Sequence, residues 1–163
     1  MPRDTQRAKV YAAEQLVRTL FDRADERGNR AVDFFGAQLT LPPEARFGSV
    51  DAVRRYVAEV MKLPSVRTRW PRADPLTVRA RRGATAAHWE FDGTVATVAV
   101  PDRHTTWALR ELVVLHEIAH HLSRAEPPHG PQFVVTFCEL AEAVMGPEVG
   151  HVLRVIYAKE GVR

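Results

Sequence analysis

The chain has 163 residues, of which 45% are apolar and 26% are charged, as expected for one globular domain with a buried core. No stretch approaches the 18 or so consecutive apolar residues that a membrane-spanning helix requires, and no apolar secretion signal follows the first residues. The single cysteine, Cys138, excludes an intrachain disulfide framework and a four-cysteine zinc ribbon. We therefore expect a single domain over residues 1–163, without a membrane anchor, in a reducing cytoplasm.

The net charge of +3 is distributed unevenly along the chain. Residues 1–82 contain 17 Lys and Arg against 10 Asp and Glu, whereas residues 83–163 contain 6 against 10. The densest basic stretch is residues 66–82, where six arginines accompany a single acid, Asp74. Such a segment can attract nucleic acid or another acidic partner. A loop followed by the solvent side of a strand would give the same charge run, and the sequence leaves both interpretations open.

The N-terminal part of the chain predicts a helix followed by a strand. In residues 5–27 apolar side chains recur at three- and four-residue steps, and Gly28 follows as a stop signal. This pattern is typical of an amphipathic helix. Residues 32–41 are rich in valine, phenylalanine and leucine, which predicts a strand with an irregularity at Gly36.

A second helix and a loop are expected next. Ser49 can cap a helix whose buried stripe consists of valines and a methionine and which ends before Pro64. Residues 63–75 contain three prolines and are interpreted as a connecting loop.

The strongest sheet signal lies in residues 76–100. Apolar and polar residues alternate in residues 76–80 and 87–91, and Asp92-Gly93 is typical of a hairpin leading into residues 94–100. We predict a three-stranded antiparallel meander from this pattern. Its last strand is apolar at nearly every position, so we expect both of its faces to be covered.

Three helices are predicted after the sheet. Residues 107–124 have helical periodicity, residues 131–144 begin with a proline and end before Gly146-Pro147, and residues 148–159 form a last short helix. Together with the preceding strands, these elements predict an α+β fold.

The helix of residues 107–124 contains the string His116-Glu117-Ile118-Ala119-His120, an HExxH motif. Residues four apart lie on one face of a helix, so His116 and His120 can present two imidazole nitrogens to one Zn²⁺ ion. Glu117 would project beside them and could take a proton from a water on the metal, generating the attacking hydroxide. With seven His and twelve Glu in the chain, roughly 0.02 such strings are expected by chance, so an incidental HExxH is the less favoured alternative.

A catalytic zinc site needs a third protein ligand and an open position. His129 is the best candidate, because the chain can turn after Pro127-Pro128 and return this side chain, with Gly130 giving the backbone freedom. Glu139 and Glu142 on the next helix are competing third ligands. His121 points about 100° away from His120 on the helix, which favours a structural role for it.

The string from His116 to His121, followed by His129-Gly130-Pro131-Gln132-Phe133, resembles the SprT-like branch of the zincin metallopeptidases. The chain as a whole is similar to a group of small predicted metallohydrolases from actinobacteria and their phages. The specific match covers residues 107–133. The resemblance implies a zincin-like fold, with a small antiparallel or mixed sheet packed against the HExxH helix and flanking helices, and it implies zinc held by His116, His120 and His129.

The resemblance also has limits and consequences. The metzincin pattern does not fit, because Ser123 and Glu126 occupy the positions of its glycine and third histidine. SprT-like proteases often carry a cysteine zinc ribbon, which one cysteine cannot form, so digestion of DNA-bound proteins is not implied. The zincin layout implies that residues 94–100 are an edge strand beside the cleft, to which an extended peptide could pair.

The sequence therefore supports two hypotheses. The first is a zinc-dependent hydrolase, in particular a metallopeptidase acting on peptides or proteins, in which Glu117 is the general base. The second is a zinc-stabilised, non-enzymatic binding module that uses the basic segment 66–82 to hold nucleic acid or an acidic partner. A hydrolase also needs a group that stabilises the transition state. The sequence does not choose among five candidates for this role: His104, Arg103, His151, Tyr157 and Arg124.

Overall fold

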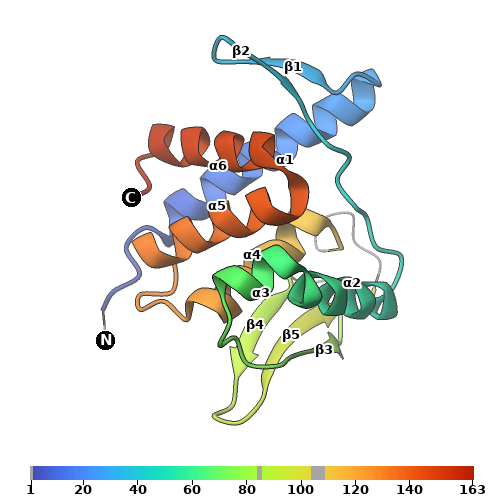
Figure 1. Cartoon of the computed structure of the whole chain (residues 1–163), viewed down its shortest axis with the longest axis vertical. Helices are drawn as coiled ribbons and strands as arrows, with labels where there is room; N and C mark the ends of the chain where they lie inside the picture. The colour runs from blue at the N-terminus through green and yellow to red at the C-terminus, as the bar shows by residue number, and fades with distance from the viewer. Residues whose placement is uncertain (1, 84–85, 104–108) are drawn as a thin grey trace. The chain divides into compact units, whose positions relative to one another are not determined.

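The structure is a computed structural model that describes residues 2–83, 86–103 and 109–163 (Figure 1). These residues form six helices and five strands, which confirms the predicted α+β class. The chain divides into two compact units: residues 1–44 with residues 124–163, and residues 45–123. In the described part of the chain, no helix combines the length and the apolar character needed to cross a membrane.

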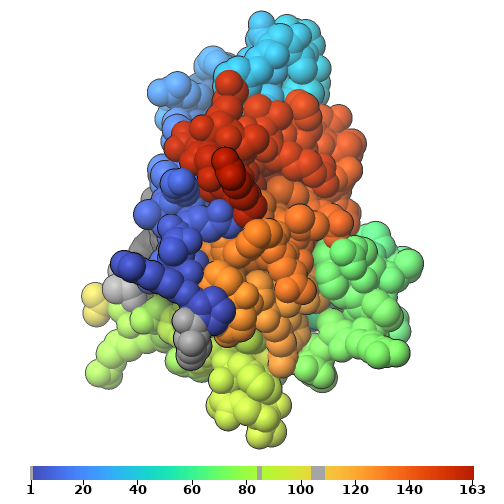
Figure 2. Space-filling view, turned by 90° about the vertical axis from the view of Figure 1, so that its left-hand side faces the viewer, coloured from blue at the N-terminus to red at the C-terminus, as the bar shows by residue number. Residues whose placement is uncertain are grey.

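The first unit is built on three helices, α1 (Arg7–Arg27), α5 (Pro131–Met145) and α6 (Pro147–Lys159). Helix α6 packs against both α1 and α5, and Figure 2 shows α6 in red beside α1 in blue at the surface. All three helices were predicted from apolar periodicity, and each end lies within two residues of the expected one. Their buried stripes supply the core of this unit: Val10, Val17, Phe21, Phe133, Phe137, Leu140, Val152 and Leu153.

A two-stranded hairpin completes the first unit. The single strand predicted for residues 32–41 is wrong: the structure has β1 (Ala31–Phe34) paired antiparallel with β2 (Ala37–Thr40). The irregularity expected at Gly36 is the turn itself, because Phe35 and Gly36 have φ angles of 48° and 84°. Two consecutive positive φ angles are typical of the tight turn whose twist matches a hairpin.

The second unit begins with helices α2 (Val50–Lys62) and α3 (Pro64–Arg69). The predicted cap is confirmed, since the Ser49 hydroxyl accepts a hydrogen bond from the Ala52 amide at 3.1 Å. The loop expected for residues 63–75 is wrong over its first part, where α3 forms. Pro64 occupies the first turn of α3, where its fixed φ favours helix and its missing N–H costs nothing.

The sheet of the second unit consists of β3 (Leu76–Arg81), β4 (His88–Phe91) and β5 (Ala96–Pro101) in the order β3-β5-β4. The hairpin expected at Asp92-Gly93 joins β4 to β5. The antiparallel meander is wrong, however, because β3 pairs with β5 and runs parallel to it. The physical reason is burial: β5 carries the residues least exposed to solvent, which favours the central position. Ala96, Val98, Ala99 and Val100 are each at most 2% exposed.

The basic segment 66–82 is distributed over several elements. Its arginines lie on α3, on the segment after α3, on β3 and directly after β3. On the polar face of the sheet, Arg79 is paired with Glu90 of β4 at 2.7 Å. Hydrogen bonds from Arg79 and His88 lower the pKa of Glu90 to about 2. The interpretation of the run as a solvated strand face is therefore correct for β3.

Helix α4 (Glu111–Ser123) carries the HExxH motif and packs against β4, β5 and α2. The predicted helix began at Trp107, which lies outside the described residues. The first turn of α4 is fixed by Glu111, whose carboxylate accepts hydrogen bonds from the Ala45 amide at 3.0 Å and from the Tyr56 hydroxyl. The Glu111 amide donates in turn to the Ala45 carbonyl at 2.9 Å. These contacts position α4 within its unit.

Candidate metal centre

Helix α4 is buried almost all around, in agreement with its apolar sequence. Ten of its thirteen residues are buried, including His116, Glu117 and His121. Ionisable groups are costly to bury unless they are paired with other polar groups or with a metal. The contacts of each polar side chain on α4 therefore indicate its role.

His116 and His120 lie one turn apart on α4, and their Nε2 atoms are 3.1 Å apart. The two ring centroids are 4.8 Å apart, and the ring planes form an angle of 72°. A tetrahedral Zn²⁺ ion about 2.0 to 2.1 Å from each of two imidazole nitrogens would separate them by about 3.3 Å. The observed pair is therefore close to the spacing of two histidine ligands of one zinc ion.

Glu117 follows His116 on α4 and is only 6% exposed. Its Oε2 atom accepts a hydrogen bond of 2.7 Å from the backbone amide of Trp89 on β4. This contact joins the motif to the sheet and restricts the orientation of the carboxylate. Sequence reasoning missed this contact, because a backbone amide can occupy such a position whatever its side chain.

His121 has a different environment from the pair beside it. Its Nε2 atom is 2.7 Å from the carbonyl oxygen of Asp74 and its Nδ1 atom accepts a hydrogen bond of 3.3 Å from the indole N–H of Trp89. The ring must therefore carry its proton on Nε2, where it donates to Asp74. With both nitrogens engaged, His121 connects α4 to the segment before β3 and to β4, as expected for a structural histidine.

His129 belongs to the first unit and is 5% exposed. The predicted turn is present: the Gly130 amide donates to the Pro127 carbonyl at 3.0 Å, and α5 begins at Pro131. A Cβ atom at Gly130 would lie 3.1 Å from the Pro127 carbonyl oxygen. Glycine is thus favoured here by the close approach of the backbone and not by an unusual φ angle.

Two residues near the N-terminus hold His129 in place. The Nδ1 atom of His129 is 2.8 Å from the Asp4 carboxylate, and its carbonyl oxygen accepts a hydrogen bond of 2.8 Å from the Gln6 amide. The ring also lies between Tyr11 and Phe133, each with its ring centroid 5.2 Å away. Histidines that bind a metal through one ring nitrogen commonly donate a hydrogen bond from the other nitrogen to a carboxylate. The contact with Asp4 is of this kind and would make Nε2 the metal-binding nitrogen.

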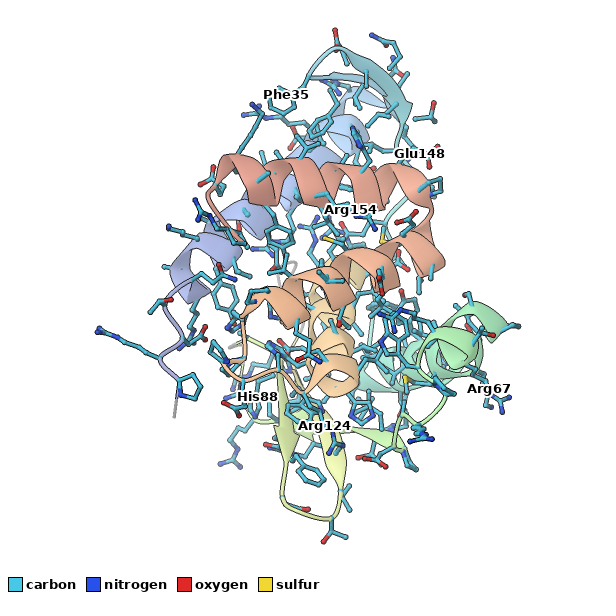
Figure 3. All side chains as sticks on the ribbon, turned by 60° about the vertical axis from the view of Figure 1, so that its left-hand side comes forward. Phe35, Arg67, His88, Arg124, Glu148 and Arg154 are labelled. Atoms are coloured by element: carbon cyan, nitrogen blue, oxygen red, sulfur yellow. The ribbon has the colours of Figure 1, made fainter. Side chains whose placement is uncertain are left out.

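The competing third ligands lie on α5. Glu142 forms an ion pair of 2.6 Å with Arg154 of α6, and Figure 3 labels Arg154 where α6 runs beside α5. This ion pair gives Glu142 a structural role within the helical unit. Glu139 is half-buried on the same helix.

The groups considered for transition-state stabilisation have varied environments. The Tyr157 hydroxyl is buried and donates to the Glu14 carboxylate at 2.7 Å, and burial with this contact raises its pKa well above 10. Arg103 is exposed, as is Arg124, and the exposed His151 lies against Phe34. His104 lies outside the described residues. The environments of these residues therefore do not identify which side chain would stabilise the transition state.

Cys138, the single cysteine of the chain, lies in helix α5 of the first unit. It is 3% exposed, and desolvation raises the pKa of its thiol to about 12. Since the thiolate is the nucleophilic form, this cysteine is not a candidate nucleophile at neutral pH.

The sheet edge differs from the expected one. Residues 94–100 were expected to form an edge strand, but β5 is central and pairs with a strand on each side. In the described part of the sheet, β4 is an edge, and it packs against α4 through Trp89. The strand next to the motif helix is therefore β4.

The structure thus brings His116, Glu117 and His120 together on α4 in one unit and places His129 beside the Asp4 carboxylate in the other. No family model, no curated protein and no solved structure matches this chain.

Proposed function

We propose that this chain is a zinc-dependent hydrolase of peptide bonds with a zincin-like fold of the SprT-like kind. The observation that carries the proposal is the pair of Nε2 atoms of His116 and His120, 3.1 Å apart on a buried helix with Glu117 between them in sequence. His129 is the proposed third ligand, because a carboxylate, that of Asp4, holds its ring by Nδ1, as is common for metal-binding histidines. Three protein ligands and an open position are typical of catalytic zinc.

The donor set fits zinc better than a harder cation. Imidazole nitrogen is a ligand that Zn²⁺ prefers, whereas Mg²⁺ and Ca²⁺ prefer oxygen. Bound zinc would act as a Lewis acid toward the scissile carbonyl and would lower the pKa of water toward neutrality. The residues of the chain then have to orient the ligands and transfer protons.

Glu117 is the proposed general base and proton donor. Its Oε2 atom is held by the Trp89 amide, and in this orientation the carboxylate would take a proton from the attacking water. The same carboxyl group can then deliver that proton to the leaving amine. The hydrogen bond to Trp89 keeps the carboxylate in one orientation through both steps.

A peptide is the proposed substrate because of β4. An extended peptide can add to a sheet edge through main-chain hydrogen bonds, and β4 is an edge strand that contacts the motif helix. A peptide paired with β4 would pass close to Glu117, which already touches the backbone of this strand.

Removal of the metal tests the proposal. Protein dialysed against a chelator should lose peptidase activity on a quenched-fluorescence peptide library, and stoichiometric Zn²⁺ should restore it. Elemental analysis should give one zinc per chain before dialysis. Full activity in metal-free protein would contradict the proposal. A zinc-loaded protein that cleaves no peptide, and that merely melts at lower temperature without zinc, would indicate a structural metal.

Asp4→Asn should weaken zinc binding without removing a ligand. The amide of asparagine can still accept a hydrogen bond from His129 Nδ1, but it lacks the charge that makes the imidazole more basic. We expect zinc affinity, measured by competition with a chromophoric chelator, to fall roughly 10- to 100-fold. Asp33→Asn in the β1–β2 hairpin is the charge-matched control and should leave the affinity unchanged. Equal affinities for all three proteins would exclude a positioning role for Asp4.

A further inference from the structure

A cavity of about 540 Å³ lies on the second unit, and none of the residues proposed to bind zinc lines it. It is formed by the end of α2, by α3 and by the segment that follows α3. Its wall combines apolar and cationic side chains with one hydroxyl group. The six that matter are Met61, Lys62, Val66, Arg67, Thr68 and Trp70.

The charge of this surface is strongly positive. Residues 50–82 contain nine Lys and Arg against three Asp and Glu, and none of the described residues that line the cavity is acidic. Arg54 and Arg79 are paired with acids of their own, Asp51 and Glu90. Lys62 and Arg67 are exposed at the cavity, and Figure 3 shows Arg67 at the outer side of α3. The cavity therefore presents two cations and attracts an anion.

An aromatic ring adds a second kind of contact. Trp70 ends α3, is half-buried and lines the cavity. The Arg69 guanidinium lies 5.2 Å from the Trp70 ring centroid, a cation–π contact that restricts the ring. An indole ring at a cationic surface offers a stacking platform for a planar group, which a simple anion such as phosphate would not use.

We propose that this cavity binds a segment of single-stranded nucleic acid, with one base stacked on Trp70 and flanking phosphates on Lys62 and Arg67. Aromatic stacking combined with a cationic groove is how proteins bind single strands. A duplex could contact the cations through its phosphates, but its paired bases could not stack on Trp70. An acidic peptide could also contact the cations, but it would not use the indole ring for stacking. Arg69 and Arg72 continue the positive surface along the chain, which suits a polymer better than a mononucleotide.

Fluorescence anisotropy of a labelled oligothymidylate tests this site on the full chain. Binding should weaken with salt. Arg67→Ala should lower the slope of log K against log salt by roughly 0.7, the value for one phosphate contact with a single strand. Trp70→Leu should weaken binding roughly ten-fold or more, because base stacking is lost, whereas Trp70→Phe should retain most of the affinity. Thermal unfolding of each variant verifies that it folds.

Three controls make the result decisive. Arg23→Ala removes an exposed cation of α1 in the other unit and should leave the salt slope unchanged. A duplex of equal length and polyglutamate should compete poorly. The proposal is overturned if Arg23→Ala acts like Arg67→Ala, if both Trp70 variants bind as the unchanged protein does, if the duplex or polyglutamate competes equally, or if no binding occurs at low salt. Glu117→Gln should bind the oligonucleotide normally, so this site and the proposed hydrolase activity succeed or fail separately.

Discussion

Glu117→Gln protein should bind zinc as tightly as the unchanged protein and hydrolyse peptides at least about 100-fold more slowly. Glutamine preserves the size of the side chain and can still accept the hydrogen bond from the Trp89 amide, so helix α4 and its histidines should keep their positions. What glutamine cannot do is take a proton at neutral pH. Zinc content by elemental analysis and kcat on a quenched-fluorescence peptide measure the two expectations.

A matched substitution separates this effect from a general loss of charge. Glu59→Gln changes an exposed glutamate of α2 in the same unit and should leave both zinc content and kcat unchanged. If Glu117→Gln protein retained full kcat, Glu117 would not be the general base. If it lost zinc as well as activity, the substitution would have disturbed the site, and the general-base role would require a further variant.

His129→Ala should weaken zinc binding more than Asp4→Asn does, by well over the roughly 100-fold that the loss of a neighbouring carboxylate can cost. Alanine removes the imidazole itself, whereas asparagine at position 4 leaves it in place. The expected order of zinc affinity, measured by chelator competition, is unchanged protein, Asp4→Asn, then His129→Ala. Circular dichroism should show that α1, α5 and α6 remain folded, since their buried stripes do not include His129.

Two further substitutions in the same unit serve as a control and as a test of the competing third ligand. His151→Ala removes an exposed histidine of α6 and should leave zinc affinity unchanged. Glu139→Ala should also have little effect. Loss of zinc from Glu139→Ala protein, with normal binding by His129→Ala protein, would instead support a ligand set of two histidines and a glutamate, as in thermolysin-like enzymes.

Helices were predictable from the sequence because their signals are local. Apolar side chains at three- and four-residue steps located α1 and α5, and the Ser49 cap located α2. The same reasoning failed for α3, where the prolines of the segment suggested a loop. Proline interrupts a helix only in its interior, and Pro64 stands in the first turn of α3, where it is favourable.

Strand pairing was less predictable because it is not local. The hairpin of β4 and β5 is predicted by the turn residues between them. No pattern of neighbouring residues predicts that β3 pairs with β5 and runs parallel to it. The composition of residues 94–100 did indicate a strand covered on both faces. Placing the most apolar strand in the centre would have followed from that observation, and the meander would then have been rejected.

The amino-acid sequence by itself determined the motif helix and the pairing of two histidines on it, because residues one turn apart share a face: the Nε2 atoms of His116 and His120 lie 3.1 Å apart. Only the tertiary structure decided what orients these groups. Asp4 reaches the ring of His129 across 125 positions of chain, and the Trp89 amide meets Glu117 from another strand. Such contacts depend on how separate elements pack, and a linear sequence carries no periodic signal for them.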